Sequence, residues 1–506
     1  MHEFDESELT LESRLTNVIT LMIPVRPYTL HCAWTQEVPL PAIEEFTCRL
    51  LVLLDEVLPG NIREYFGLTQ RECDILIEGL VYNRLAVYTE SGHLAASTIL
   101  RNKAQANGEV LPSLTRYEER VETPIFDLLT LSMIAPRKQH RHRFGLPCLS
   151  IADEFKRIGQ QEIMKAFGQQ YHTYLEQHQK SERETRHSRL YKISSCEAGD
   201  LDLVAIDVAI TLESTLTGPV RMTKTAEDKG SNRRPLTVEM EAKISDFLNQ
   251  QGCPDNGLSF EKYCERVDDQ VLVRHMQRGN FDFNSWLNAR RESKTGYGTP
   301  QTQAIVGPVY LAKNRRTIER LVRDKAKEWP EESTFTALWM ASKVPLWAAN
   351  GQLIGDFVYN LEPMLSASRE GSGSICAVMS ENLRSDNRAA FSQRIPNGIT
   401  FDGAGFEDRM EIFLIPDQLA VVQFHCQPSS DSAITVPIGY ITIDPERIAL
   451  VESILRARLA GRYQPILAWG TKDRTLSQLF DAERFISSPT PNQQAQIIFK
   501  PKKRSI

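Results

Sequence analysis

Apolar positions recur at helical spacing from residue 42 to residue 84 and predict three helices. The first covers 42–58, the second is a short helix that ends at Gly67, and the third covers 70–84. Thr69 is suited to cap the third helix, because Glu72 three residues later completes a capping box. On the first helix, one face carries Ile43, Phe46, Leu50, Leu53, Leu54 and Val57. We expect one shared core, built around Ile43, Leu50, Leu54, Ile62, Phe66, Ile75 and Leu80.

The segment that follows these helices alternates between apolar and polar residues and turns at Ser91-Gly92, which predicts a hairpin over 85–98. Three helices followed by a two-stranded wing resemble a winged-helix domain, a variant of the helix-turn-helix, over residues 40–100. The resemblance implies that 70–84 is the recognition helix. The residues that it places toward DNA are Asn61, Arg63, Thr69, Gln70 and Arg71.

The same segment carries acidic residues that do not suit a DNA reader. Glu72, Asp74 and Glu78 would each lie near a polyanion if helix 70–84 entered a groove. Arg71 and Gln70 are chemically suited to base edges or phosphate. Two interpretations of the winged helix therefore stay open: contact with DNA, and contact with another protein.

The rest of the chain predicts an α+β multi-domain fold, with a helical middle and a mixed α/β domain at the C-terminal end. Strand-like runs precede the winged helix, and an α+β connecting region follows it. From Ala304 strands and helices alternate, and a helix is expected after Asp444-Pro445, where Asp caps and Pro suits the first helical position. The expected regions are 1–39 (strands), 40–100 (winged helix), 101–216 (connecting domain), 236–291 (helical), 304–490 (α/β domain) and 491–506 (basic tail).

Two basic segments are candidates for binding a phosphate backbone. In the helix predicted over 314–328, apolar residues Ile318, Leu321 and Val322 lie opposite a basic face about three turns long, on the order of 16 Å. A second segment, "RKQHRHR", covers 137–143. Ordinary solvated surface is the alternative for both. The candidate cations are Arg316, Arg320, Arg323 and Lys327 on the helix, and Arg137, Lys138, Arg141 and Arg143 in the second segment.

Composition narrows the class of protein further. The chain has 506 residues and a net charge of −6, so it does not coat nucleic acid with its whole surface. Its nine cysteines include no CxxC pair, which disfavours structural zinc and a disulfide framework and favours reduced thiols in a cytoplasm. The N-terminus is acidic, unlike a signal peptide, and no apolar run approaches 18 residues. We expect no membrane span, no metal and no cofactor.

Familiar catalytic motifs are absent from the sequence. It contains no GxxxxGK[ST], GxSxG or HExxH motif, so no catalytic residue is assigned. The strands and helices from 304, with "DRMEIFLIPDQLAVVQFHC" (408–426), resemble the C-terminal half of phospholipase D-like domains. Those domains need HxK followed by Asp, and no His or Lys stands at 408–417. The resemblance therefore implies a degenerate, inactive domain.

Three functional hypotheses follow. The first is a non-enzymatic, cytoplasmic subunit that binds DNA and partner subunits in a prokaryotic multi-protein system such as anti-phage defence. The second is a scaffold whose winged helix binds protein and does not contact DNA. The third is an enzyme of unfamiliar type in the C-terminal half, which would require acidic, His or Lys side chains to converge in one pocket. The sequence leaves the oligomeric state, the partner and any preferred DNA sequence open.

Overall fold

The computed structural model describes residues 13–106, 113–134, 145–177, 188–215, 219–227, 236–252, 257–292, 294, 296–368, 373–380, 384–401, 409–428, 433–460, 465–471 and 474–486. The chain divides into two compact units, and its class is mixed α+β, as predicted. The larger unit comprises Met1–Pro24, Pro136–Ile151 and Leu203–Ile506. The smaller unit comprises Val25–Ala135 and Ala152–Asp202. Each unit is described by itself.

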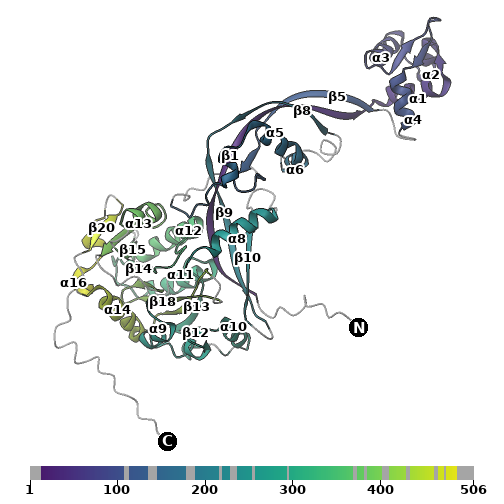
Figure 1. The fold of residues 1–506 in the computed structure, drawn as a ribbon. Coiled ribbons are helices and arrows are strands. Elements are labelled where there is room, and N and C mark those ends of the chain that lie inside the picture. Colours follow the sequence, from purple (N-terminus) through teal and green to yellow (C-terminus); the bar gives the residue numbers. More distant parts are fainter. Residues whose placement is uncertain are drawn as a thin grey trace, which may run out of the picture. The chain divides into compact units, whose positions relative to one another are not determined.

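The smaller unit contains the three predicted helices and the predicted hairpin (Figure 1). We call residues 40–100 the helical module. Its three strands form an antiparallel sheet in the order β2-β4-β3. The elements are α1 (Ala42–Leu54), β2 (Glu56–Val57), α2 (Pro59–Phe66), α3 (Gln70–Tyr82), β3 (Ala86–Tyr88) and β4 (Leu94–Ala96), followed by α4 (Thr98–Ala106).

The core of the helical module agrees with the sequence prediction only in part. Ile62 and Leu80 are buried as expected, whereas Ile43, Leu54 and Ile75 are exposed, so their assignment to the core was wrong. The reason is the orientation of α1 and α3. Both helices have apolar residues on more than one side, and periodicity alone does not say which side faces inward. The inward residues are Thr47, Cys48 and Leu51 on α1, and Cys73, Leu76, Ile77 and Leu80 on α3.

The remainder of the smaller unit is a β-sheet covered by two helices. The helical module is an insertion between two paired strands, because Pro39 at the end of β1 lies opposite Ser113 at the start of β5. Aromatic side chains fill the core, among them Trp34, Phe126 and Phe167. The elements are the second half of β1 (Ser13–Pro39), β5 (Ser113–Glu122), β6 (Ile125–Asp127), β7 (Met133–Ile134), η2 (Asp153–Phe155), α5 (Gln160–Gln169), α6 (Tyr171–Gln177) and β8 (Ser188–Ala198).

The larger unit is built on an eight-stranded sheet in the order β13-β19-β18-β17-β14-β15-β16-β20. Only the neighbours β14–β15 and β15–β16 are parallel; the other pairs are antiparallel. The strands are β13 (Thr302–Val306), β14 (Thr336–Met340), β15 (Ser374–Ser380), β16 (Asn397–Phe401), β17 (Met410–Ile415), β18 (Leu419–Cys426), β19 (Val436–Thr442) and β20 (Ile466–Trp469).

Helices cover both faces of this sheet (Figure 1), so each face has its own core. Tyr263, Trp286 and Val451 belong to one core, and Ile318 and Phe357 to the other. The first face is covered by α9 (Phe260–Arg266), η3 (Leu272–His275), α10 (Phe283–Arg291), α14 (Pro445–Leu459), α15 (Leu476–Leu479) and α16 (Ala482–Phe485). The second face is covered by α11 (Ala312–Ala326), α12 (Gly351–Leu361) and η4 (Glu362–Leu365).

Helix α14 begins where the sequence predicts. The Asp444 side chain caps it by accepting the Glu446 backbone N–H at 2.9 Å, and Pro445 occupies the first position. The larger unit also contains β9 (Asp202–Glu213), β10 (Arg221–Glu227), α8 (Val238–Asn249), β11 (Met276–Gln277), β12 (Asn280–Phe281) and α13 (Arg384–Phe391).

The first half of β1 lies against the loop that leads into α12. The Thr20 backbone N–H donates to the Ala349 carbonyl at 2.7 Å, and the Asn350 side chain donates to the Val18 carbonyl at 3.0 Å. Gly307 adopts φ +85°, and a Cβ there would lie 2.5 Å from the Thr16 carbonyl oxygen. These contacts bring β1 to one wall of the cavity described below. No helix in the described ranges has the length and apolar character needed to cross a bilayer.

The phase of α3 can be tested by two matched substitutions. Leu80→Ala removes a fully buried side chain and is expected to lower the free energy of opening of α3 by about 2–5 kcal/mol. Ile75→Ala, at a position that is 61% exposed, is expected to change it by less than about 0.5 kcal/mol. Native-state hydrogen exchange of α3 peptides in the full chain measures both. A larger loss of opening free energy for Ile75→Ala than for Leu80→Ala would show that Ile75, and not Leu80, faces the core.

Candidate functional site

Helix α3 begins with the capping box predicted from Thr69 and Glu72. The Thr69 hydroxyl accepts the Glu72 backbone N–H at 3.3 Å, and the Glu72 carboxylate accepts the Thr69 backbone N–H at 2.9 Å. The Thr69 hydroxyl also donates to the Glu72 carboxylate at 2.8 Å. The two hydrogen bonds that the carboxylate accepts from Thr69, first from the backbone N–H and then from the hydroxyl, hold the pKa of Glu72 below its usual value. Thr69 therefore serves the start of the helix, and a negative charge lies beside it.

The neighbouring candidates Arg63 and Gln70 are joined to each other. Arg63 Nη1 donates to Gln70 Oε1 at 2.8 Å, and Gln70 Nε2 donates to Asp74 Oδ1 at 2.9 Å. Both polar ends of the Gln70 amide are thus used within the protein. Asn61 on α2 and Arg71, which follows Gln70 in the first turn of α3, are both exposed.

The charge of the helical module is strongly negative. Residues 40–100 contain four arginines, no lysine and nine acidic residues, for a net charge of −5. Most of the net charge of −6 of the whole chain therefore falls in this segment. Binding to a DNA backbone depends on neutralising phosphates with Lys and Arg, so the net charge of the module does not favour it.

The outward face of α3 is partly apolar. Arg71, Ile75, Glu78 and Tyr82 follow one another at i, i+4, i+7 and i+11, and all four are exposed. Ile75 is 61% exposed and Tyr82 is 88% exposed. Two large apolar side chains are thus exposed on this face of α3, beside the acidic Glu78.

Helix α11 carries the basic face that the sequence predicts. Arg316, Arg320, Arg323 and Lys327 are all exposed, and Lys327 Nζ pairs with Asp324 Oδ1 at 2.8 Å. Residues 312–328 contain seven basic and three acidic residues, for a net charge of +4. The opposite face is buried as expected, through Ile318, Leu321 and Val322.

The start of α11 is fixed by a buried amide. Asn314 Nδ2 donates to the carbonyls of Val306, Gly307 and Pro308 at 2.9, 3.0 and 2.9 Å. These hydrogen bonds tie the first turn of α11 to the segment that follows β13. The other basic candidates, Arg137, Lys138, Arg141 and Arg143, lie outside the described residues.

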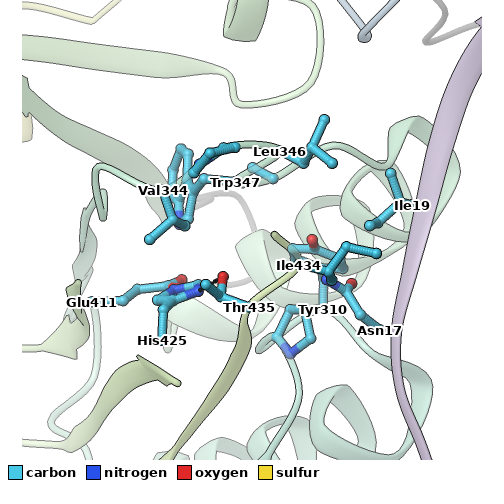
Figure 2. A pocket seen from close by; sticks show the side chains of 13 residues that line it. Asn17, Ile19, Tyr310, Val344, Leu346, Trp347, Glu411, His425, Ile434 and Thr435 are labelled. Carbon is cyan, nitrogen blue, oxygen red and sulfur yellow. Dashed lines mark hydrogen bonds and ion pairs between the residues drawn. The ribbon is translucent and has the colours of Figure 1, made fainter. Parts of the chain in front are cut away.

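A buried polar cluster that the sequence analysis did not identify lies on the second face of the sheet (Figure 2). Glu411 on β17 and His425 on β18 are 2% and 5% exposed, and His425 Nε2 lies 2.6 Å from Glu411 Oε2. The other carboxylate oxygen, Oε1, accepts Trp339 Nε1–H at 2.6 Å. The carboxylate thus has a partner on each oxygen, which a buried charge requires.

The second nitrogen of His425 faces a hydroxyl. His425 Nδ1 lies 3.4 Å from Thr435 Oγ1, so acid, imidazole and hydroxyl form a row (Figure 2). Burial, and then the charge of Glu411, raise the pKa of Tyr310 well above its usual value. Burial also lowers the pKa of Arg394 to about 10. Nucleophilic catalysis uses an acid, a base and a hydroxyl in this order. Whether this row could act on a substrate therefore depends on the space beside it.

The cavity beside this row is too small for a substrate. Its volume is about 20 Å³, enough for one water molecule. A loop lines it, in which Leu346 and Ala348 adopt positive φ of 61° and 52°. Asn17 of β1 also lines it. The described residues contain no group of three His, Cys, Asp or Glu side chains placed to hold a metal ion. The cavity beside Glu411, His425 and Thr435 has room for one water molecule, and the hydrogen bonds of these side chains join β17 to β18.

The signal for this cluster was present in the sequence. Glu411, Gln423 and His425 interrupt the otherwise apolar runs "MEIFLI" and "LAVVQFHC". Polar residues inside a fully buried strand need partners, so their presence predicts a buried network. Which residues form it depends on the β17–β18 pairing, which places Glu411 opposite Gln423. The sequence does not give this pairing.

Comparisons with known proteins give little further guidance. No known protein family matches the chain. No curated protein matches it either. One similar solved structure is that of TrmBL2, an archaeal chromatin protein, whose published description reports a mode of DNA binding. The match covers 45% of this chain and 72% of that one, at 10% identity and a TM-score of 0.18. Similarity this low supports no inference about fold or function.

The buried row can be tested through stability. Glu411→Leu leaves Trp339 Nε1–H and His425 Nε2 without partners, and each loss is expected to cost about 1–3 kcal/mol. Glu411→Gln retains an acceptor and a donor and is expected to cost less than half as much. Urea unfolding followed by tryptophan fluorescence measures both, because five of the six tryptophans lie in the larger unit. Equal costs for the two variants would show that the hydrogen bonds do not matter.

Proposed function

We propose that the helical module is a winged helix and that the chain is a non-catalytic binding protein. The order of its elements, helix, strand, two helices and a two-stranded hairpin, supports the first part. In this arrangement α3 occupies the position of the recognition helix, and β3 and β4 form the wing. The absence of catalytic motifs from the sequence supports the second part.

The partner of α3 in this proposal is a basic protein surface. The observation that carries it is the exposure of Ile75 and Tyr82 on a module of net charge −5. Apolar side chains supply contact area at the centre of an interface, and opposite charge guides the encounter. Asp74 and Glu78 flank the apolar pair, which suits a basic protein and opposes a phosphate backbone. The DNA contacts expected of Asn61, Arg63, Thr69, Gln70 and Arg71 are therefore not included in the proposal.

A second candidate function rests on α11. The exposed Arg316, Arg320, Arg323 and Lys327 on a helix of net charge +4 favour contact with a nucleic-acid backbone. Contact of these cations with phosphates would be independent of base sequence, because phosphate contacts carry no sequence information. We predicted that the protein belongs to a prokaryotic multi-protein system such as anti-phage defence. No feature of the described residues tests this prediction.

The contact at α3 can be tested with a photo-crosslinking residue at position 82. In cells, we expect it to capture a specific protein of high isoelectric point, whereas the same residue at Tyr359, which is 80% exposed in the larger unit, captures none. The captured protein, purified, should bind the full chain, and Ile75→Asp should weaken that binding at least tenfold. Binding should also weaken as salt rises. Capture of nucleic acid at position 82, or an unchanged affinity of Ile75→Asp, would contradict the proposal.

The contact at α11 can be tested by a salt titration of binding to a duplex of about 30 base pairs. Replacing Arg320 and Arg323 with Glu is expected to weaken binding for every sequence and to lower the salt slope by about two. Stability should barely change, because exposed charges contribute little. Arg71→Glu is the matched control and should leave the slope unchanged. An unchanged slope in the double variant would remove α11 from consideration.

A further inference from the structure

Strand β13 forms one edge of the eight-stranded sheet, and within the described residues it pairs with β19 alone. The pairing is antiparallel, with Thr302 opposite Thr442 and Val306 opposite Ile438. In an antiparallel ladder, alternate residues turn both backbone groups toward the neighbouring strand, and the residues between them turn both groups away. An edge strand therefore presents N–H and C=O groups that its own sheet does not use.

The register shows which residues of β13 turn their backbone groups outward. At the two ends of the segment, the Gly307 N–H donates to the chain of β19 at 2.8 Å, and the Gln301 carbonyl accepts an N–H from the residue after β19 at 3.0 Å. The odd-numbered residues from 301 to 307 therefore face β19, because the pairing has no shift between these two hydrogen bonds. The backbone groups of Thr302, Ala304 and Val306 consequently point to the free edge.

The open part of this edge is short. The Val306 carbonyl is already used, since it accepts the Asn314 side chain at 2.9 Å, and β1 passes beside the next residue. Thr302 and Ala304 remain, and their two N–H and two C=O groups have no hydrogen-bond partner among the described residues. Together they could pair with a strand of about three to five residues.

A cleft with a volume of about 430 Å³ lies along the open edge. It is lined by Arg290 of α10, by residues 296–299 of the following loop and by residues 302–304 of β13, all of which belong to the larger unit. Ligand sites commonly have volumes of about 300–1,000 Å³. The loop is anchored to the larger unit, because Tyr297 Oη donates to the buried Asp269 Oδ2 at 2.7 Å.

The loop end of the cleft offers hydrogen-bond donors. The backbone N–H groups of residues 296–299 have no partner among the described residues. Gly298 adopts φ +75°, and a left-handed residue in a turn allows successive N–H groups to point to one side, where they can hold an anion. Arg290 is the one charged residue among those that line the cleft within the described ranges. Donors and positive charge at the same end suit a carboxylate.

We propose that the cleft binds the C-terminal end of another protein. The bound segment adds to β13 as an antiparallel strand and places its terminal carboxylate beside Arg290 and the N–H groups of residues 296–299. An extended peptide supplies the N–H and C=O partners for Thr302 and Ala304, and strand addition to a sheet edge is a recurring mode of peptide recognition. This inference goes beyond the proposed function, because it concerns neither α3 nor α11.

The charge at the loop end selects the direction of the peptide. The loop precedes β13 in the chain, so it lies at the end where an antiparallel strand finishes and a parallel strand begins. An antiparallel strand brings a carboxylate to Arg290, whereas a parallel strand would bring the ammonium group of an N-terminus. Like charge opposes the parallel arrangement. An internal segment has no terminal carboxylate to place among the N–H groups.

The first test uses peptides with free C-termini. A library of random hexapeptides with free carboxylates is screened against the full chain, and the tightest binder is synthesised both as the acid and as the C-terminal amide. Fluorescence anisotropy measures the two affinities. We expect the acid to bind at least about tenfold more tightly, because the amide loses charge-assisted hydrogen bonds. Recovery of no binder, or equal affinities for acid and amide, would overturn the proposal.

Substitution of Arg290 locates the carboxylate. Arg290→Gln should weaken binding of the acid at least about fivefold and leave binding of the amide unchanged. Arg266→Gln is the matched control and should change neither affinity, because Arg266 is exposed on α9 of the same unit and does not line the cleft. A structural role of Arg290 would affect both peptides alike, so an equal loss for acid and amide, or no loss, would count against this placement.

Methylation of the peptide backbone tests strand addition without altering the protein. In a paired strand, every second N–H faces β13 and the others face away. N-methylation at successive positions should therefore weaken binding at least about fivefold at alternate residues and by little between them. A site for a small anion would need the carboxylate alone and would not respond to methylation far from the terminus. Absence of the alternation would overturn strand addition at β13.

Discussion

Strands β17, β18 and β19 are buried along their whole length, and this two-sided burial constrains everything built on the sheet. A polar side chain on these strands has no access to bulk water, so it must find a partner inside. Glu411 meets this requirement on both oxygens, with Trp339 and His425. Gln423 meets it with its amide N–H, which donates to the Gly307 carbonyl at 2.8 Å, whereas its amide oxygen has no partner among the described residues. The same Gly307 carbonyl accepts from Asn314, which fixes the start of α11. The position of the basic helix thus depends on the polar contacts of the buried sheet.

The sequence predicts most of the elements because their patterns are local. Helix α11 has one apolar and one basic side, so its phase was predicted correctly, down to the burial of Ile318. Helix α1 has two apolar sides, and the prediction placed Ile43 and Leu54 in the core where Cys48 and Leu51 stand. Periodicity identifies an apolar face, but only tertiary packing decides which of two apolar faces is buried.

The candidate sites differ in the same way: some follow from local pattern, and others depend on tertiary packing. The exposed cations of α11 could be predicted, because exposure follows directly from helical phase. The pair of Glu411 and His425 could not, because it depends on how two neighbouring strands align across a hairpin. The charges of the module could be counted from the sequence, but the hydrogen bonds that its polar side chains form could not be predicted. Gln70, expected to face DNA, uses its amide on Arg63 and Asp74 within the protein.

The net charge of −6 of the whole chain does not show that two of its segments carry opposite charge. The helical module carries −5 and the α11 segment +4, so the two favour partners of opposite sign. In the proposed function, a basic protein surface is attracted to the module and a phosphate backbone to α11, so the net charge of the whole chain predicts neither partner. Both proposed contacts should weaken as salt rises, and they differ in the sign of the charge that the partner carries.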